Sequence, residues 1–170
     1  MKKLLQLLLV ILVSYPLQAQ MPNSSKKLVF GLGAGTYSAN QISGVSGIFD
    51  LTHEEKNYFY KFRLIANREV ELSLNGEDFE DYNAEVALLT GWLSEGRNFK
   101  VAISTGIALV SGQEIKKGPR KKKYTVPGIP AQVEAKVKLS SNKNIGFGFA
   151  LNVNEEQSFT VFFVKLNMRS

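Results

Sequence analysis

Apolar and polar positions alternate along almost the whole chain after residue 27, and this two-residue period is typical of β-strands. In the stretch NYFYKFRLIAN, for example, Tyr60 and Phe62 fall on one face while Lys61 and Arg63 fall on the other. The pattern recurs in eight segments, and no helical period is sustained between them. It predicts strands at residues 28–39, 44–53, 57–67, 81–93, 98–111, 124–139, 143–154 and 158–169.

The positions opposite the apolar face are often occupied by small residues. They include Gly31, Gly33, Gly35, Ala102, Ser104, Gly106, Ala108, Gly146, Gly148 and Ala150. A strand surface that faces water has no need of small side chains, whereas the interior of a narrow eight-stranded barrel does. The apolar face carries Tyr58, Tyr82 and Trp92 near strand ends, where the aromatic girdles of transmembrane barrels lie.

These features predict an all-β fold, an eight-stranded antiparallel up-and-down transmembrane β-barrel whose apolar face contacts lipid. Each segment reaches the roughly nine to eleven residues that a tilted strand needs to cross a bilayer. The alternative is a soluble periplasmic or secreted barrel, lipocalin-like, that turns the apolar face inward around an apolar ligand. Partitioning of the mature chain with membranes after carbonate washing would distinguish the two.

The start of the chain has the pattern of a cleaved signal peptide. Lys2 and Lys3 precede an apolar run at residues 4–13, and a small-residue exit ends at Ala19. The run is too short for a transmembrane helix, which needs about twenty residues. The chain has no cysteine, so no disulfide stabilises the exported domain. We therefore expect a signal peptide at residues 1–19, a leader at 20–27 and a β-barrel domain at 28–170.

Two connections between the expected strands are long and charged: residues 68–80 are acidic and residues 112–123 are basic. The connections at residues 54–56, 94–97 and 140–143 lie at the other end and are short, as the periplasmic turns of outer-membrane barrels are. We therefore expect both long loops on the outer face and both termini on the periplasmic side. The basic loop holds Lys116, Lys117, Arg120, Lys121, Lys122 and Lys123.

The excess positive charge of the chain is concentrated in this basic loop. Removal of Lys2 and Lys3 from the 21 basic residues leaves 19 against 15 acidic ones, a net charge of +4. A nucleic-acid-binding surface usually spreads basic residues over a face and interleaves aromatic ones, so we expect no nucleic-acid partner. Two interpretations stay open: the acidic and basic loops pair with each other, or the basic loop binds the phosphates of lipopolysaccharide.

The face that would line the lumen carries both signs of charge. Its charged residues are Asp50, Lys61, Arg63, Glu85, Lys100, Glu134, Lys136, Lys138 and Lys165. Because buried charges are costly unless they are paired, we expect ion pairs between neighbouring strands. Counting from the turns places Asp50 opposite Lys61, and Arg63 near Glu85. We interpret these residues as a structural ion-pair network that fills the lumen; the alternative is a small ion pathway.

With these features the chain resembles the small eight-stranded outer-membrane β-barrel proteins, the outer membrane protein beta-barrel domain family, over residues 28–170. The resemblance rests on the signal peptide, the eight amphipathic segments, the Gly-rich first and seventh segments, and GIPAQVEAKVKL followed by NIGFGFALNV. The last strand of the family commonly ends in an aromatic residue that the assembly machinery reads. This chain ends KLNMRS, which implies an internal signal such as Phe162.

The resemblance implies an outer-membrane location and contact with outer-membrane lipid, lipopolysaccharide and the barrel assembly machinery. It also implies a role in envelope integrity, adhesion or surface binding, and it leaves the oligomeric state open. Some barrels of this kind modify lipid A with a His, a Ser and an acid near the outer leaflet. Here the single histidine, His53, lies beside a turn at the periplasmic end. We therefore expect neither an enzyme nor a cofactor.

Overall fold

The computed structural model describes residues 27–39, 42–69, 82–96, 98–115 and 121–170. The expected signal peptide, most of the leader and most of the acidic loop lie outside these residues. Eight strands follow one another along the chain. They are β1 (Lys27–Ala39), β2 (Ile42–Glu55), β3 (Tyr58–Glu69), β4 (Tyr82–Glu95), β5 (Phe99–Ile115), β6 (Lys121–Lys138), β7 (Lys143–Asn154) and β8 (Phe159–Arg169).

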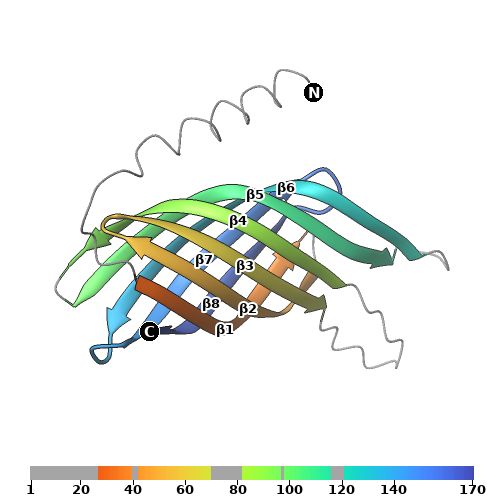
Figure 1. The fold of residues 1–170 in the computed structure, drawn as a ribbon. Coiled ribbons are helices and arrows are strands. Elements are labelled where there is room, and N and C mark those ends of the chain that lie inside the picture. Colours follow the sequence, from red (N-terminus) through yellow and green to blue (C-terminus); the bar gives the residue numbers. More distant parts are fainter. Residues whose placement is uncertain (1–26, 40–41, 70–81, 97, 116–120) are drawn as a thin grey trace, which may run out of the picture.

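The strands form one closed barrel in sequence order (Figure 1). Every neighbouring pair is antiparallel, and β1 closes the barrel against β8, with Val29 paired to Arg169 at one end and Ser38 to Thr160 at the other. Closure leaves no strand edge unpaired along the barrel wall, which is a requirement for a β-structure in lipid. The expected fold class, an eight-stranded antiparallel up-and-down barrel, is confirmed.

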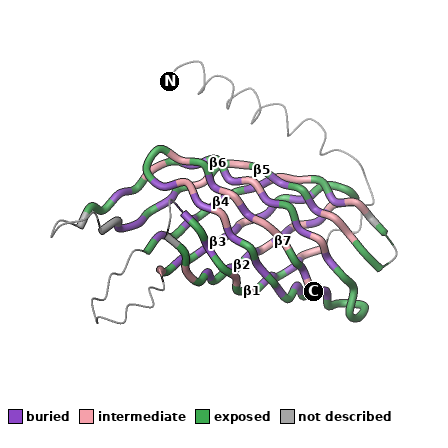
Figure 2. The backbone as a smooth tube through the Cα atoms, turned by 180° about the vertical axis from the view of Figure 1, so that it is seen from behind, coloured by how far each residue is buried: buried purple, intermediate pink, exposed green. Residues whose placement is uncertain are grey.

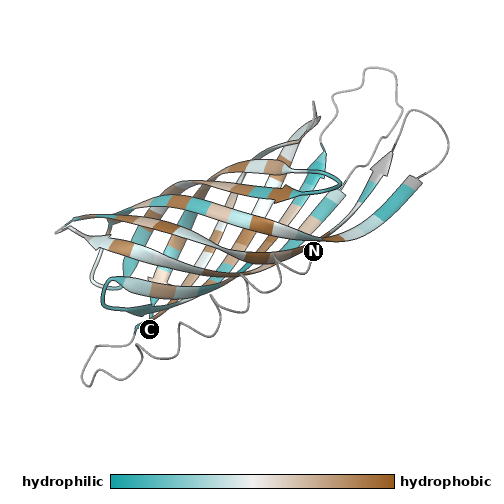
Figure 3. Ribbon diagram, turned by 90° about the horizontal axis from the view of Figure 1, so that it is seen from above, coloured by the Kyte–Doolittle hydropathy of each residue, from teal (hydrophilic) through white to brown (hydrophobic). Residues whose placement is uncertain are grey.

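The apolar face of each strand points outward. Exposed fractions reach 66% at Leu32 and 66% at Phe162, whereas Arg63 on the opposite face is 0% exposed. Figure 2 shows this alternation of buried and exposed residues along the strands, and Figure 3 shows brown apolar residues alternating with paler or teal ones. A barrel that carries apolar ligands needs the reverse arrangement, so the structure does not favour the soluble lipocalin-like alternative.

The structure also explains why two of the inner positions are glycine. A Cβ atom on Gly146 would collide with the carboxylate of Glu134, and one on Gly31 would collide with that of Asp50. Glycine at these positions therefore leaves the space that the buried carboxylates occupy.

The strand bounds differ from the expected ones at the loop end of the barrel. β5 continues to Ile115 and β6 begins at Lys121, so the expectation of an irregular loop over residues 112–123 is wrong for both of its flanks. The apolar alternation stops near residue 111, but backbone pairing continues with polar side chains on both strands. A hairpin outside the bilayer needs no apolar face, and its hydrogen-bonded ladder does not depend on one.

No helix in the described part of the chain is long and apolar enough to cross a membrane.

Candidate functional site

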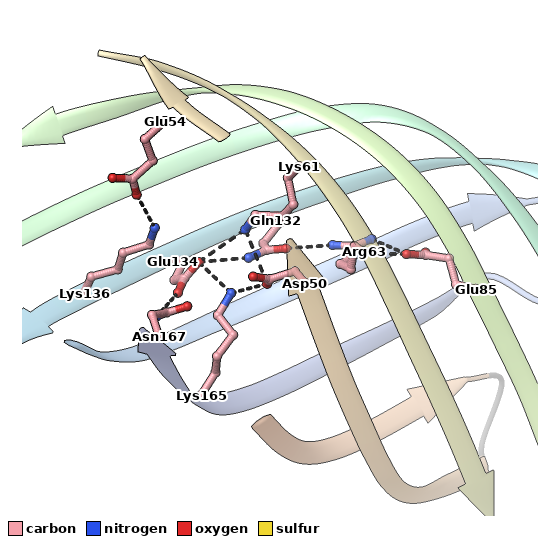
Figure 4. A network of polar contacts seen from close by, with 10 residues as sticks. All are labelled: Asp50, Glu54, Lys61, Arg63, Glu85, Gln132, Glu134, Lys136, Lys165 and Asn167. Atoms are coloured by element: carbon pink, nitrogen blue, oxygen red, sulfur yellow. Dashed lines mark hydrogen bonds and ion pairs between the residues drawn. The ribbon is translucent and has the colours of Figure 1, made fainter. Parts of the chain in front are cut away.

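The most distinctive feature of the interior is a cluster of buried charges around Glu134 of β6 (Figure 4). One carboxylate oxygen, Oε2, accepts a hydrogen bond from Lys165 Nζ at 2.9 Å and lies 3.4 Å from Lys61 Nζ. The other, Oε1, accepts one from Asn167 Nδ2 at 3.0 Å. Glu134 therefore joins β3 and β8 across the lumen, although neither strand is its neighbour in the sheet.

Asp50 of β2 completes this arrangement. Its Oδ2 atom pairs with Lys165 Nζ and lies 3.6 Å from Lys61 Nζ. Asp50, Lys61, Glu134 and Lys165 thus form a ring, called here the four-charge ring, in which carboxylates and ammonium groups alternate. Each member is at most 2% exposed, so each charge depends on its partners rather than on water.

A second buried pair lies next to the ring on its loop side. Arg63 Nε donates to Glu85 Oε1 at 2.8 Å, and Arg63 Nη1 donates to Gln132 Oε1 at 3.0 Å. Gln132 Nε2 in turn donates to Glu134 Oε2 at 3.2 Å, which links this pair to the ring. Asn152 Nδ2 donates to the free oxygen of Glu85 at 2.7 Å. Both oxygens of Glu85 and both oxygens of Glu134 therefore accept hydrogen bonds from buried donors.

A third group lies toward the turns. Glu54 accepts a hydrogen bond from Lys136 Nζ at 3.2 Å and another from Arg169 Nη2 at 3.1 Å. The alternation predicts a turn at Glu54, but this residue lies in β2 and faces inward. Its even spacing from Asp50 and Thr52, both of which also face inward, is the sequence signal that would have found it.

Two expectations about the lumen are wrong in detail. Asp50 is paired in register with Arg63 rather than with Lys61, which is paired with Thr52, so the expected register is shifted by two residues. Lys138, expected inside, is exposed at the end of β6, while Lys100 is half-buried at the same end of the barrel. Both lysines line the rim, because the strands end there and the interior opens to water.

The loop side of the interior is mainly apolar rather than charged, with the hydrogen-bonded amides of Asn67, Asn83 and Gln157 beside the apolar residues. A cluster of ten buried residues fills it, namely Tyr37, Ala39, Ile48, Ile65, Val110, Tyr124, Ala150, Phe159, Val161 and Phe163, and it is called here the loop-side core. A smaller cluster of Phe59, Leu93 and Ala102 lies toward the turns. The expectation of a polar lumen therefore describes the middle of the barrel only, and side chains fill the interior on both sides of it.

The basic run is only partly described. Lys116, Lys117 and Arg120 lie outside the described residues, as does most of the acidic loop, whereas Lys121, Lys122 and Lys123 belong to β6. Lys122 Nζ lies 2.6 Å from Glu156 Oε2 in the β7–β8 connection. Below this surface pair, Tyr124 donates to Gln157 Oε1 at 2.7 Å.

His53 lies in β2, as expected, and the strand continues two residues further, to Glu55. It is half-buried, and its neighbours in register are Leu28 and Tyr60. Among the described residues, no group of three or more His, Cys, Asp or Glu side chains is arranged to hold a metal ion.

No protein-family model and no curated protein matches this sequence. The structure, however, is similar to solved β-barrels. Neisserial surface protein A aligns with a TM-score of 0.65 at 8% identity, over 86% of this chain and 98% of that one. The N-terminal barrel domain of OprF from Pseudomonas aeruginosa aligns with a TM-score of 0.65 at 6% identity, over 87% and 100%.

A third similar structure is Ail, the attachment invasion locus protein of Yersinia pestis, solved in complex with the heparin analogue sucrose octasulfate. It aligns with a TM-score of 0.60 at 6% identity, over 87% of this chain and 99% of that one. Identities this low show the fold alone. The chain has the fold of the small eight-stranded outer-membrane β-barrels, and the apolar band around it is the surface that such a barrel presents to lipid.

Proposed function

We propose that this protein is a non-enzymatic, closed barrel of the outer membrane that binds phosphate groups of lipopolysaccharide through its basic β5–β6 hairpin. Through this contact it serves envelope integrity or adhesion. The observation that carries the proposal is the combination of a filled lumen with a cationic hairpin that extends beyond the neighbouring strands. The filled lumen argues against transport, and the cationic hairpin provides a surface for an anionic partner.

The filled lumen supports a role other than conduction. Arg63, Glu134 and Lys165 are 0%, 0% and 2% exposed, so they are not in contact with a water-filled channel. The loop-side core closes the barrel on one side of these charges. An eight-stranded barrel encloses only enough space for side chains, so the alternative of a small ion pathway has no open route along the lumen.

The β5–β6 hairpin is the longest in the barrel, with strands of 17 and 18 residues. β7 pairs with β6 only from Gly128 onward, so residues 121–127 are paired with β5 alone among the described strands. Lys122 and Lys123 are exposed on this extension. The hairpin therefore carries its positive charge beyond the end of β7, at the end of the barrel opposite the C-terminus.

The ion pair between Lys122 and Glu156 does not prevent this use. Both side chains are partly exposed, at 47% and 30%, and surface pairs of this kind contribute about 0–1 kcal/mol. A phosphate group can therefore replace Glu156 at little cost. That Ail, a barrel of the same fold, was solved with a bound polysulfated sugar supports the idea that this architecture can carry a polyanion site.

The test compares two double variants in the folded, detergent-purified protein. Lys122→Gln/Lys123→Gln removes two charges from the hairpin, and Lys56→Gln/Lys143→Gln removes two exposed charges near the turns. At about 1 kcal/mol per lysine near an anionic surface, the first variant should bind lipopolysaccharide vesicles about 30-fold more weakly. The control should bind as the parent protein does, and all proteins should lose affinity as salt rises.

Enzymatically dephosphorylated lipopolysaccharide separates charge from other contacts. The parent protein should bind it about as weakly as the hairpin variant binds the phosphorylated form. Equal loss in the hairpin variant and in the turn-end control, or unchanged affinity for dephosphorylated lipopolysaccharide, would contradict the proposal.

A further inference from the structure

The opposite, turn-side end of the barrel contains a polar hollow of about 190 Å³ that the proposed surface function does not use. Lys136 and Lys138 of β6 and Arg169 of β8 line it, Lys100 of β5 lies at its rim, and Asn144 of β7 contributes an amide. The volume is several times the roughly 30 Å³ that one water occupies in the liquid. A small anion with part of its hydration shell therefore fits.

The wall of this hollow carries more positive than negative charge. No carboxylate is among the described residues that line it, and Glu54 pairs with two of the lining cations, Lys136 at 3.2 Å and Arg169 at 3.1 Å. Lys138 makes no ion pair within the described part of the chain. Even with Lys100 left aside, three cationic side chains thus line the hollow, and Glu54 balances the charge of only two of them.

One buried group in the wall also lacks a partner. The Nε atom of Arg169 is buried and has no hydrogen-bond acceptor among the described residues. Asn144 lines the hollow as well, and no side-chain hydrogen bond within the same part of the chain occupies its amide. Buried donors in native proteins normally find an acceptor, so Arg169 Nε points to a group that accepts hydrogen bonds. An oxyanion suits an arginine especially well, because its oxygens match the fork of the guanidinium.

The aromatic side chain of Phe59 lies near one cation of the hollow and one of the four-charge ring. The centre of the Phe59 ring lies 6.0 Å from Lys136 Nζ and 5.4 Å from Lys61 Nζ. Leu93 and Ala102 pack with Phe59 into a small apolar cluster. Among the described residues, Asp50 and Glu134 form their ion pairs with Lys61 and Lys165 and not with the cations that line the hollow.

We propose that this hollow is a phosphate-binding site in which Arg169, Lys138 and Asn144 hold the oxygens of the anion. Glu54 keeps Arg169 and Lys136 in place and stops the site from being a diffuse patch of positive charge. The ligand chemistry is that of a phosphate monoester or diester. It is supplied either by a free phosphate compound or by the headgroup of an anionic phospholipid in the leaflet at the turn end.

The first experiment titrates inorganic phosphate into the folded barrel in an uncharged alkyl glycoside detergent, at constant ionic strength maintained with chloride, and follows heat. We expect saturable binding that Lys138→Gln weakens about tenfold, the effect of losing one charged hydrogen bond. Lys143→Gln is the matched control, because Lys143 is exposed in the same turn region but does not line the hollow. It should change the affinity less than twofold. Heat-modifiable migration on a gel verifies that every variant is folded.

A second titration uses dihexanoyl phosphatidylglycerol below its micelle-forming concentration. Binding at least tenfold tighter than that of inorganic phosphate, with the same loss in Lys138→Gln, identifies a lipid headgroup as the source. Similar affinities identify a free phosphate compound. Absence of saturable binding by both ligands overturns the proposal, and so does an equal loss in Lys138→Gln and Lys143→Gln. Because Lys138 lies at the opposite end from the β5–β6 hairpin, these results do not depend on the lipopolysaccharide experiment.

Discussion

The middle and the loop side of the barrel interior are filled in different ways, and β3 shows both. Read from the turn side, its inward residues are Phe59, Lys61, Arg63, Ile65 and Asn67. The two cations in the middle, Lys61 and Arg63, form ion pairs with carboxylates of other strands. Ile65 packs in the loop-side core. The middle of the lumen therefore depends on particular partners, and the loop side depends on filled volume.

This difference matters for register. A slip of one residue would turn the apolar face inward, and the lipid around the barrel opposes that strongly. A slip of two residues leaves every inward residue inward and every outward residue outward, so the apolar alternation does not oppose it. It would, however, move Lys61 away from Asp50 and Glu134, and isolated buried charges are costly. The apolar alternation thus fixes which way each strand faces, and the buried charges oppose slips between strands.

The largest effect is expected from Glu134→Gln, which keeps the shape of the side chain but removes its charge. Lys61 and Lys165 would then share Asp50 alone, leaving excess positive charge in the lumen. Breaking a buried ion pair in this way costs about 3–5 kcal/mol. The measurement is the free energy of unfolding by urea in lipid vesicles or detergent.

The double variant Glu134→Gln/Lys61→Met tests the mechanism of that loss. Removing one cation restores the charge balance of the ring, so much of the lost stability should return. Glu156→Gln is the control, since its pair with Lys122 is partly exposed and worth about 0–1 kcal/mol. If the changes in unfolding free energy caused by the two ring substitutions simply add, the ring does not act as a unit.

The loop-side core should respond to volume instead. Ile65→Val removes one methylene from a residue that is 1% exposed and should cost about 0.5–1.5 kcal/mol. Ile107→Val is the matched control, because Ile107 is 45% exposed on the outer face, where lipid chains fill the space of a lost methylene. The unfolding free energies of the two variants should differ by most of that amount. Equal losses would mean that the inner position is no better packed than the outer one.

The sequence predicts the strands and their faces well, because the side on which a residue lies depends only on its neighbours in the chain. It predicts partners across the lumen poorly. Lys61 and Glu134 are 73 positions apart and lie on strands that are not adjacent, so their contact depends on barrel closure and on the tilt of the strands. The two-residue error in pairing Asp50 is of the kind that alternation cannot reveal.

The loop-side core was missed for a related reason. Ile65 shares a face with Lys61 and Arg63, and a face that contains two cations looks polar when it is read as a whole. The division into layers appears only when the inward residues of several strands are compared at the same height. The extended β5–β6 hairpin was missed because its backbone pairing outlasts the apolar pattern.

The smallest effect concerns the hydrogen bonds that border the loop-side core. Tyr124 belongs to this core, and its hydroxyl donates to Gln157 Oε1 at 2.7 Å. Tyr124→Phe keeps the ring and removes the hydroxyl, and Gln157 Oε1 still accepts a hydrogen bond from Asn83 at 3.3 Å. Because the acceptor keeps a partner, the loss should lie near the lower end of the range of about 0.5–1.5 kcal/mol for one hydrogen bond.

Tyr82→Phe is the matched control for this change. Tyr82 lies at the start of β4, at the same end of the barrel, but it is 45% exposed on the outer face. Its substitution should change the unfolding free energy by less than about 0.5 kcal/mol, as is usual for surface positions. A loss in Tyr124→Phe as large as that in Glu134→Gln would show that the loop side is also held by specific polar partners. Both the middle of the lumen and the loop side would then be polar networks with apolar side chains between them. The contrast between a region that depends on partners and one that depends on volume would be wrong.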